Sequence, residues 1–347
     1  MARDSVSNLT GRSVVIAGPN DAAVESTPVP PLKLDEVLIR VAYEGVCATD
    51  IELYAGTLGY YESGMAKYPI VPGHEFSGTI IAAGAGVSGA AVGARVVVEC
   101  IQSCGACAEC LRSNFIGCAL RAELGVIRLD GGYADYVVVP GRFVHALADS
   151  VGFREACLCE PLAVVLKGLK RLSRAWSPEP GPRRCAVIGA GPLGHLVARV
   201  LAFQGHQVTV FDHNPVRRGY FEGTGIEASD DRDRLKDFDV LAEVTGDPGA
   251  LHDILHRSSA GSTILLLGLP YSHRDFTFES IVAYDKTVVG SVGSSAVEFD
   301  EAIRMLSSLD VTHYLKCVLP LEEFRQAWLA FHEREFLKIL LQVDPRA

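Results

Sequence analysis

Four of the chain's ten cysteines follow a fixed spacing, Cys104-x2-Cys107-x2-Cys110-x7-Cys118, within residues 100–118. Three of them share one short loop and the fourth returns from beyond it, so four thiolates can surround a tetrahedral Zn²⁺ ion. Four thiolates leave no position for substrate or water, which indicates a structural site. The same ligands also suit an iron–sulfur cluster, which is the less favoured alternative.

A second set of metal donors is dispersed along the chain: Cys47 in GVCATD, His74 and Glu75 in PGHEFSG, and Glu160 in CEPLA. Taken singly, each has an ordinary interpretation, as a core cysteine, a turn histidine or an acid near a helix start. Together they offer sulfur, nitrogen and oxygen donors, the mixture typical of zinc sites that keep one position open. An open position lets the metal act as a Lewis acid on an alcohol or carbonyl oxygen.

A glycine-rich turn indicates a dinucleotide site. Gly189, Gly191 and Gly194 match GxGxxG after an apolar run, and the next apolar run ends at Asp212. Glycines at these positions allow a tight turn, close approach of a pyrophosphate and close helix–strand packing. An acid at this separation binds an adenosine ribose and favours NAD over NADP, a preference that Arg217 and Arg218 weaken slightly. A domain of this kind without a cofactor is the alternative. The remaining candidate cofactor-binding residues are Pro192, Leu193, Thr245 and Leu269.

Two kinds of element must position these residues. Residues 1–155 contain short alternating runs at 35–45, 76–84 and 93–99, punctuated by glycine and proline, which predict a β-rich domain. After a Pro-rich connection at 177–183, apolar strands alternate with helices, which predicts buried strands of a parallel sheet covered on both faces. The predicted strands are 183–191, 206–212, 238–246, 261–269 and 286–293, and the predicted helices are 192–205, 248–258 and 276–285. The tail offers a helix at 298–310 and a strand at 338–343.

Composition narrows the class of protein. The 347 residues allow about two domains, and a core of that size needs no disulfides. A net charge of −10 argues against nucleic acid, an anionic membrane surface or a DNA-binding zinc ribbon as the main role. We expect no membrane span and no export signal, and therefore a cytoplasmic protein in which clustered cysteines bind metal.

GVCATD, GHE, the four-cysteine lobe, EPLA and GAGPLG occur here in the order in which the zinc-containing medium-chain alcohol dehydrogenases carry them. From about residue 35 onwards the chain resembles that family, in particular its polyol, sugar, cyclitol and threonine dehydrogenase branch. The resemblance implies an α/β architecture, a GroES-like catalytic domain plus a doubly wound Rossmann domain. The implied boundaries are 1–160 for the catalytic domain with a lobe at about 99–120, 161–295 for the Rossmann domain, and 296–347 for a segment that completes the catalytic domain.

The resemblance also implies roles for single residues. Cys47 and His74 would be catalytic zinc ligands, with Glu75 and Glu160 as further or exchanging carboxylate ligands. Thr49 would relay the substrate proton, and Asp50 would orient His74 from outside the ligand set. Glu52 stands where many members have a histidine that ends the proton relay, so its part in such a relay is open. The other zinc would occupy the four-cysteine lobe.

The expected activity is reversible oxidation of a secondary alcohol, in which zinc lowers the pKa of the substrate oxygen and hydride passes to the nicotinamide of NAD. The expected partner is a small hydroxylated molecule, and the expected assembly is a homodimer or homotetramer. Alternatives are an NAD(P)H-dependent reductase of a small ketone or aldehyde, or a dehydrogenase of the L-threonine type. The non-enzyme alternatives are a nicotinamide-sensing module and a zinc-ribbon binding module.

Overall fold

The computed structural model describes residues 9–176, 181–270 and 274–347, and it divides into two compact units. The first contains the chain up to Glu160 and again Ser294–Ala347, and the second contains Pro161–Gly293. Part of the Pro-rich connection expected at 177–183 lies outside the described residues. No described helix has the length and apolar character that a bilayer crossing requires.

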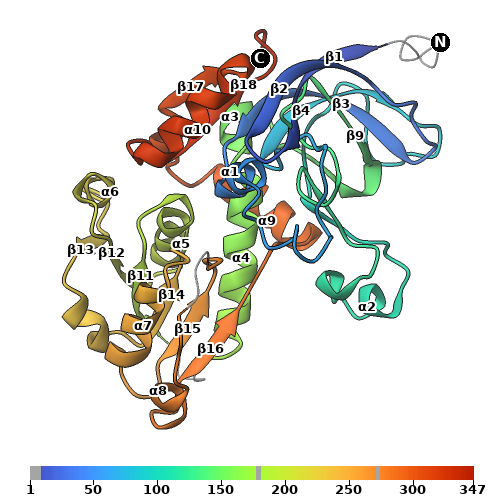
Figure 1. The fold of residues 1–347 in the computed structure, drawn as a ribbon. Helices are drawn as coiled ribbons and strands as arrows, with labels where there is room; N and C mark the ends of the chain where they lie inside the picture. Colours follow the sequence, from blue (N-terminus) through green and yellow to red (C-terminus); the bar gives the residue numbers. More distant parts are fainter. Residues whose placement is uncertain (1–8, 177–180, 271–273) are drawn as a thin grey trace. The chain divides into compact units, whose positions relative to one another are not determined.

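The first unit is built mainly from strands (Figure 1). Its strands are β1 (Thr10–Gly18), β2 (Asp21–Pro28), β3 (Glu36–Gly45), β4 (Phe76–Ala83), β5 (Arg95–Val98), β6 (Ile101–Gln102), β7 (Ala122–Leu124), β8 (Arg128–Leu129), β9 (Tyr136–Pro140), β10 (Val144–Ala146), β17 (Cys317–Pro320) and β18 (Ile339–Gln342). Its helices are α1 (Ala48–Ala55), α2 (Ala108–Leu111), α3 (Phe153–Ala156), α9 (Ala296–Leu306) and α10 (Phe324–Glu333), and its 3₁₀ turns are η1 (Phe115–Gly117), η2 (Gly141–Phe143), η4 (Thr312–Leu315) and η5 (Leu321–Glu323).

The main sheet of this unit joins the two ends of the chain. Its order is β10-β5-β4-β3-β18-β17, with β9 also paired to β3. β18 runs antiparallel to β3, so that Leu340 faces Gly45, and parallel to β17. In Figure 1, α10 lies alongside β17 and β18, and it contacts both strands. The late strand predicted at 338–343 is therefore an interior strand of the sheet that carries the metal donors.

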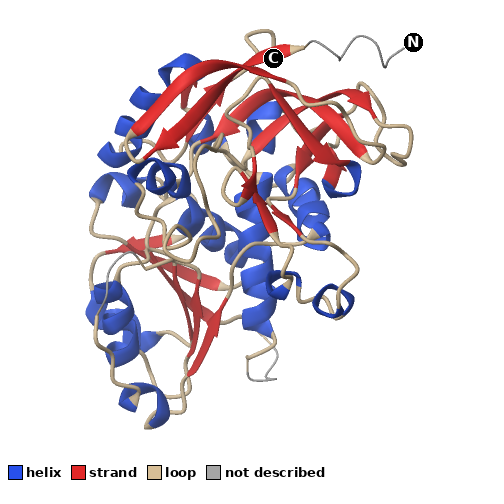
Figure 2. Cartoon of the chain, turned by 45° about the vertical axis from the view of Figure 1, so that its right-hand side comes forward, coloured by secondary structure: helices blue, strands red, loops and turns tan. Residues whose placement is uncertain are grey.

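The second unit is a six-stranded parallel sheet of order β13-β12-β11-β14-β15-β16. Figure 2 shows these strands in red with helices of the same unit in blue. The strands are β11 (Arg184–Ile188), β12 (Gln207–Phe211), β13 (Glu227–Ser229), β14 (Val240–Glu243), β15 (Thr263–Leu266) and β16 (Thr287–Gly290). The helices are α4 (Cys159–Ser173, which starts in the first unit), α5 (Pro192–Phe203), α6 (Pro215–Gly219), α7 (Pro248–Arg257) and α8 (Glu279–Val282), with the 3₁₀ turn η3 (Arg232–Asp237). The predicted fold class, a β-rich domain plus a doubly wound parallel sheet, is confirmed.

Two predicted details are wrong, and a short strand was missed. The strand expected to be buried at 286–293 is β16, an edge strand with mostly exposed side chains, because it pairs only with β15 among the described strands. The helix expected at 276–285 is reduced to the four residues of α8. Short β13 was not predicted, since three residues carry too little periodicity to be recognised.

Candidate active site

Three of the dispersed donors converge in the first unit. One ligand atom each from Cys47, His74 and Glu75 lies within 4.8 Å of the other two. Cys47 directly precedes α1, while His74 and Glu75 directly precede β4, so the ends of two rigid elements hold the set. His74 and Glu75 are buried. Sulfur, nitrogen and oxygen donors at this separation fit the three protein ligands of an open zinc site.

The electrostatics of the pocket agree with a bound cation. Burial raises the pKa of the Cys47 thiol, which by itself keeps the sulfur protonated. A coordinated zinc ion reverses this effect, because its charge deprotonates a ligating thiol. Burial alone would lower the pKa of His74, but the interaction with Cys47 and the charge of Asp50 outweigh it and raise that pKa well above its usual value. The surplus of negative groups around one imidazole is the environment that a divalent cation neutralises.

Glu75 is held by a lysine that no sequence pattern connected with the metal donors. Its carboxylate forms an ion pair with Lys338, which directly precedes β18, and the two side chains are only 4% and 3% exposed. Gly45 makes room for the pair, since a Cβ there would lie 2.8 Å from Glu75 Oε2 and 2.9 Å from Lys338 Cε. The single feature of the sequence that could have pointed to Lys338 is the position of this charged residue directly before an apolar strand.

Glu160 lies outside the group of three. It is the second residue of α4, it is buried, and its charge acts on His74. Burial is the main cause that raises its pKa to about 7, and the charge of His74 opposes that rise. The structure therefore brings three of the four proposed catalytic ligands within reach of one ion and leaves Glu160 beside them.

α1 carries three further candidates. The Cys47 backbone N–H donates to Asp50 Oδ2 at 2.9 Å, and the other Asp50 oxygen lies 3.9 Å from His74 Nδ1. Thr49 Oγ1 is 3.7 Å from Cys47 Sγ, which places the hydroxyl next to the donor set. Glu52 is half-buried one turn further on, and its place in a proton relay stays a prediction.

The four-cysteine lobe has the geometry of a closed site. The sulfur–sulfur distances are 3.8 Å for Cys104–Cys110, 3.5 Å for Cys107–Cys110 and 3.6 Å for Cys118–Cys104, and no disulfide joins them. Four sulfurs at about 2.3 Å from one zinc ion stand about 3.8 Å apart, so one ion fits. Backbone N–H groups of Ala106 and Cys107 lower the pKa of Cys104 to about 6, which favours its thiolate. An iron–sulfur cluster would hold the sulfurs further apart.

The glycine-rich turn has the close approaches that its motif predicts. A Cβ on Gly194 would lie 1.8 Å from the Gly189 carbonyl oxygen, so only glycine lets α5 start this close to β11. Gly189 has a φ of +109°, and its Cβ would meet the Thr245 methyl group at 2.7 Å. A Cβ on Gly191 would lie 3.3 Å from an Arg217 nitrogen, so the guanidinium group of Arg217 lies close to the turn. These features leave room for a pyrophosphate at the start of α5.

Asp212 directly follows β12 and faces this turn. Its carboxylate accepts hydrogen bonds from the backbone N–H groups of Ala190 at 2.7 Å and Asn214 at 2.8 Å. Thr245 follows β14 and donates through both its N–H and its hydroxyl to Glu243. The remaining cofactor candidates lie on α5 (Pro192 and Leu193) and after β15 (Leu269, which is exposed).

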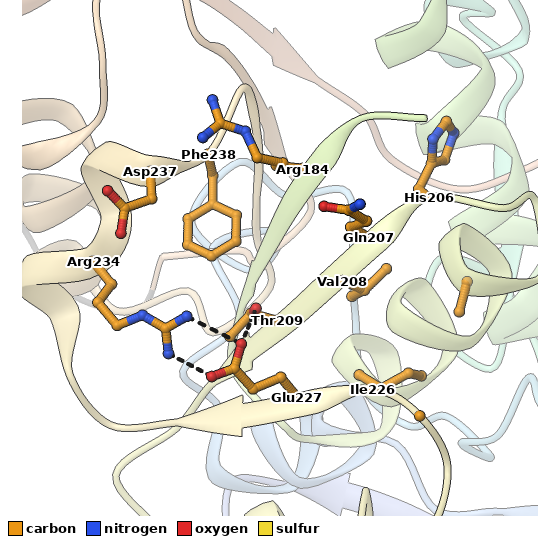
Figure 3. Close-up of a pocket in the computed structure, with 12 residues that line it drawn as sticks. Arg184, His206, Gln207, Val208, Thr209, Ile226, Glu227, Arg234, Asp237 and Phe238 are labelled. Atoms are coloured by element: carbon orange, nitrogen blue, oxygen red, sulfur yellow. Dashed lines mark hydrogen bonds and ion pairs between the residues drawn. The ribbon is translucent and has the colours of Figure 1, made fainter. Parts of the chain in front are cut away.

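A separate cavity of the second unit is not a candidate site. It lies at the start of β11 and β12, as Arg184 and Gln207 show (Figure 3). The glycine-rich turn lies at the other end of β11. Glu227 fills part of it and binds Arg234 and Thr209. Ligands of open parallel sheets bind beyond the carboxyl ends of the strands, which is the edge with the glycines.

Comparison with known families agrees with this geometry. Residues 33–149 match the alcohol dehydrogenase GroES-like domain, and residues 153–343 match the glucose dehydrogenase C-terminus. The chain belongs to the zinc-type medium-chain alcohol dehydrogenase family. This dehydrogenase is therefore an enzyme that acts on CH–OH groups.

Full-length relatives and solved structures extend the comparison. D-arabinitol dehydrogenase 1 of Uromyces fabae is 29% identical over 93% of this chain and 95% of its own, and sorbitol dehydrogenase of Bacillus subtilis (strain 168) is 28% identical over 95% and 96%. Galactitol-1-phosphate dehydrogenase from Escherichia coli is 26% identical, covers 96% of this chain and 100% of its own, and has a TM-score of 0.84. The alcohol dehydrogenase rspB from E. coli CFT073, complexed with NADH, shares the fold with a TM-score of 0.86, 24% identity and coverages of 96% and 99%.

Proposed function

We propose that this dehydrogenase catalyses the reversible oxidation of a secondary alcohol in a polyol, sugar, cyclitol or aminocyclitol, with NAD as the hydride acceptor. The observation that carries the proposal is the convergence of Cys47 with the buried His74 and Glu75, three donors rather than four, which leaves a coordination position for substrate. When bound, zinc supplies a Lewis acid and the nicotinamide ring supplies the hydride acceptor.

The chain's own residues prepare the substrate for that chemistry. We infer that Thr49 accepts the hydroxyl proton of the substrate and passes it outward, since its hydroxyl lies beside Cys47 on α1. Glu160 can exchange a proton near neutral pH, because burial raises its pKa to about 7. The ion pair with Lys338 orients Glu75 and offsets its charge.

The substrate class has support from a polar cluster close to Glu160. The Tyr60 hydroxyl accepts a hydrogen bond from Arg121 Nη2 at 3.2 Å, and Arg121 forms an ion pair with Glu123. Burial has the largest effect on the pKa of Glu160, and the charge of Glu123 makes a smaller contribution that also raises it. Donors and acceptors grouped in this way suit a molecule with several hydroxyl or amino groups, and the dehydrogenases of D-arabinitol and sorbitol are similar in sequence.

Two measurements test this function together. We expect NAD⁺ reduction with at least one member of a panel of polyols, cyclitols, aminocyclitols and L-threonine, and we expect Cys47→Ser to lose turnover and one of two zinc ions per chain. Cys317→Ser is the control, because this buried cysteine belongs to neither metal group. Wild-type turnover and zinc content in Cys47→Ser would refute the assignment. Reduction of small ketones or aldehydes without oxidation of any panel member would instead favour the reductase alternative.

We propose NAD rather than NADP because of Asp212. Its side chain is 7% exposed and fixed by two backbone N–H groups, so a negative charge stays where a 2′-phosphate would lie. Asp212→Ser should lower the ratio of kcat/KM for NAD to that for NADP at least tenfold, or about 1.4 kcal/mol. Asp233→Ser, on an exposed acid of the same unit, should leave the ratio unchanged. An unchanged ratio in Asp212→Ser would remove this residue from cofactor choice.

We also propose that the chain forms a homodimer or homotetramer. Edge strand β16 presents Val288, which is 37% exposed, and the preceding segment exposes Phe278 and Val282 at 72% and 76%. An unpaired strand edge beside exposed apolar side chains is a surface that a second copy can cover.

A further inference from the structure

A hydrogen-bonded chain runs from the C-terminal helix α10 to the metal donors. Trp328 Nε1 donates to the Tyr133 hydroxyl at 3.1 Å, and that hydroxyl lies 3.2 Å from Asp50 Oδ2. Tyr133 and Asp50 have no exposed surface, and Trp328 is 4% exposed. Nothing in the sequence connected these two aromatic residues with the metal site.

The direction of each hydrogen bond follows from the chemistry of the groups. An indole N–H can only donate, so the Tyr133 oxygen must accept from Trp328. The single hydroxyl proton of Tyr133 is then available for Asp50 Oδ2, which also accepts from the backbone N–H of Cys47. Trp328 therefore fixes a hydroxyl that would otherwise rotate.

Two donors on one oxygen set the orientation of the whole carboxylate. With Asp50 Oδ2 occupied, Oδ1 is directed toward His74 Nδ1, 3.9 Å away, and neither of these buried atoms has a hydrogen-bond partner among the residues that the structure describes. A carboxylate beside Nδ1 favours the tautomer with its proton there, which leaves Nε2 free to bind metal.

We propose that Tyr133 and Trp328 are positioning residues for the catalytic metal centre, acting through Asp50 on Cys47 and His74. This inference rests on the proposed zinc site at Cys47, His74 and Glu75. Aromatic packing makes this hydrogen-bonded chain rigid. The Trp328 ring packs edge-on against Phe324 and tilted against Tyr54, with 4.9 Å between the ring centroids in each pair. The C-terminal segment thereby contributes to metal affinity without supplying a ligand.

The test measures loss of the catalytic zinc during chelator competition, followed as zinc content falls from two toward one per chain. Tyr133→Phe should weaken this site about tenfold, as loss of a group that supports a metal ligand usually does. Trp328→Phe should weaken it less, and Tyr133→Phe with Trp328→Phe should match Tyr133→Phe alone, because both act through one hydrogen bond. The visible absorption bands of the Co²⁺-substituted site should shift in the same variants.

Tyr54→Phe is the matched control, since it removes a hydroxyl from the same aromatic cluster without touching Asp50, and it should keep wild-type zinc affinity. Melting temperatures of zinc-loaded and zinc-depleted protein distinguish a positioning role of the Tyr133 hydroxyl from a purely structural one. If the role is purely structural, loss of the hydroxyl lowers both melting temperatures equally and leaves zinc affinity unchanged. Zinc affinity within twofold of wild type in Tyr133→Phe overturns the inference. If the wild type itself holds no zinc at Cys47, the proposed function fails instead.

Discussion

At the scale of single residues, the closest approach in the dinucleotide turn is at Gly194. Because a Cβ would lie 1.8 Å from a backbone oxygen, Gly194→Ala must push α5 away from β11. We expect a loss of about 1–3 kcal/mol in stability and at least tenfold weaker NADH binding, measured by thermal melting and by fluorescence titration. Gly219→Ala should change neither, since its Cβ would have no neighbour closer than 3.9 Å. Unaltered NADH affinity in Gly194→Ala would contradict the placement of the pyrophosphate.

His145 gives the first unit a pH-dependent contribution to stability. Its ring nitrogens lie 3.0 Å from Glu99 and 2.8 Å from Asp300. Burial lowers the pKa of His145, but these two carboxylates outweigh it and raise the pKa. A raised histidine pKa stabilises the fold fully below the unfolded value of about 6.5, and this contribution is lost as pH rises through the folded value.

His145→Gln should therefore lower the free energy of unfolding most at low pH. We expect the free energy of unfolding to fall by about 1.5 kcal/mol relative to wild type at pH 6 and by less at pH 9. Most of the loss at pH 6 comes from the interaction with buried Glu99, because Asp300 is 55% exposed. Thermal melts of both proteins across this range measure it, with exposed His332→Gln as the reference. A deficit that grows with pH would show that His145 is neutral in the fold.

At the scale of elements, the four-cysteine lobe should fold around its own metal ion. The segment has little other regular structure, since α2 and η1 together cover seven residues and β6 covers two. Cys110→Ser should lower zinc from about two to about one per chain and destabilise this segment, as zinc analysis and proteolysis of the lobe will measure. Two zinc ions retained in this variant would exclude the closed four-thiolate site.

The elements also show what sequence can and cannot predict. Period-two runs located β3 and β4, and the strand–glycine–helix order located β11 and α5, because these signals are local. The exposure of β16 was missed, since an apolar run does not tell an edge strand from a central one. Lys338 and Trp328 reach the site through the pairing of β18 with β3, which joins segments far apart in sequence and leaves no local signal.

At the scale of the whole molecule, we expect the proposed homodimer or homotetramer to form through the edge at β16. Val288→Lys places a charge on that strand and should shift the mass in light scattering after size exclusion toward the monomer. Val92→Lys, at an exposed valine of the first unit, should keep the wild-type mass. A dimer or tetramer that persists in Val288→Lys would locate the interface elsewhere.

The sheet that joins β3 to β18 has a consequence for biosynthesis. Cys47, His74 and Glu75 leave the ribosome long before Lys338, and the contiguous second unit is made in between. At about 5–20 residues per second, roughly 10–35 s separate synthesis of Glu160 from that of Lys338. During this interval the nascent chain holds a carboxylate without its ion-pair partner and a strand without its neighbour. We expect stalled chains that lack β18 to be cleaved by protease within residues 36–160 while residues 184–290 resist.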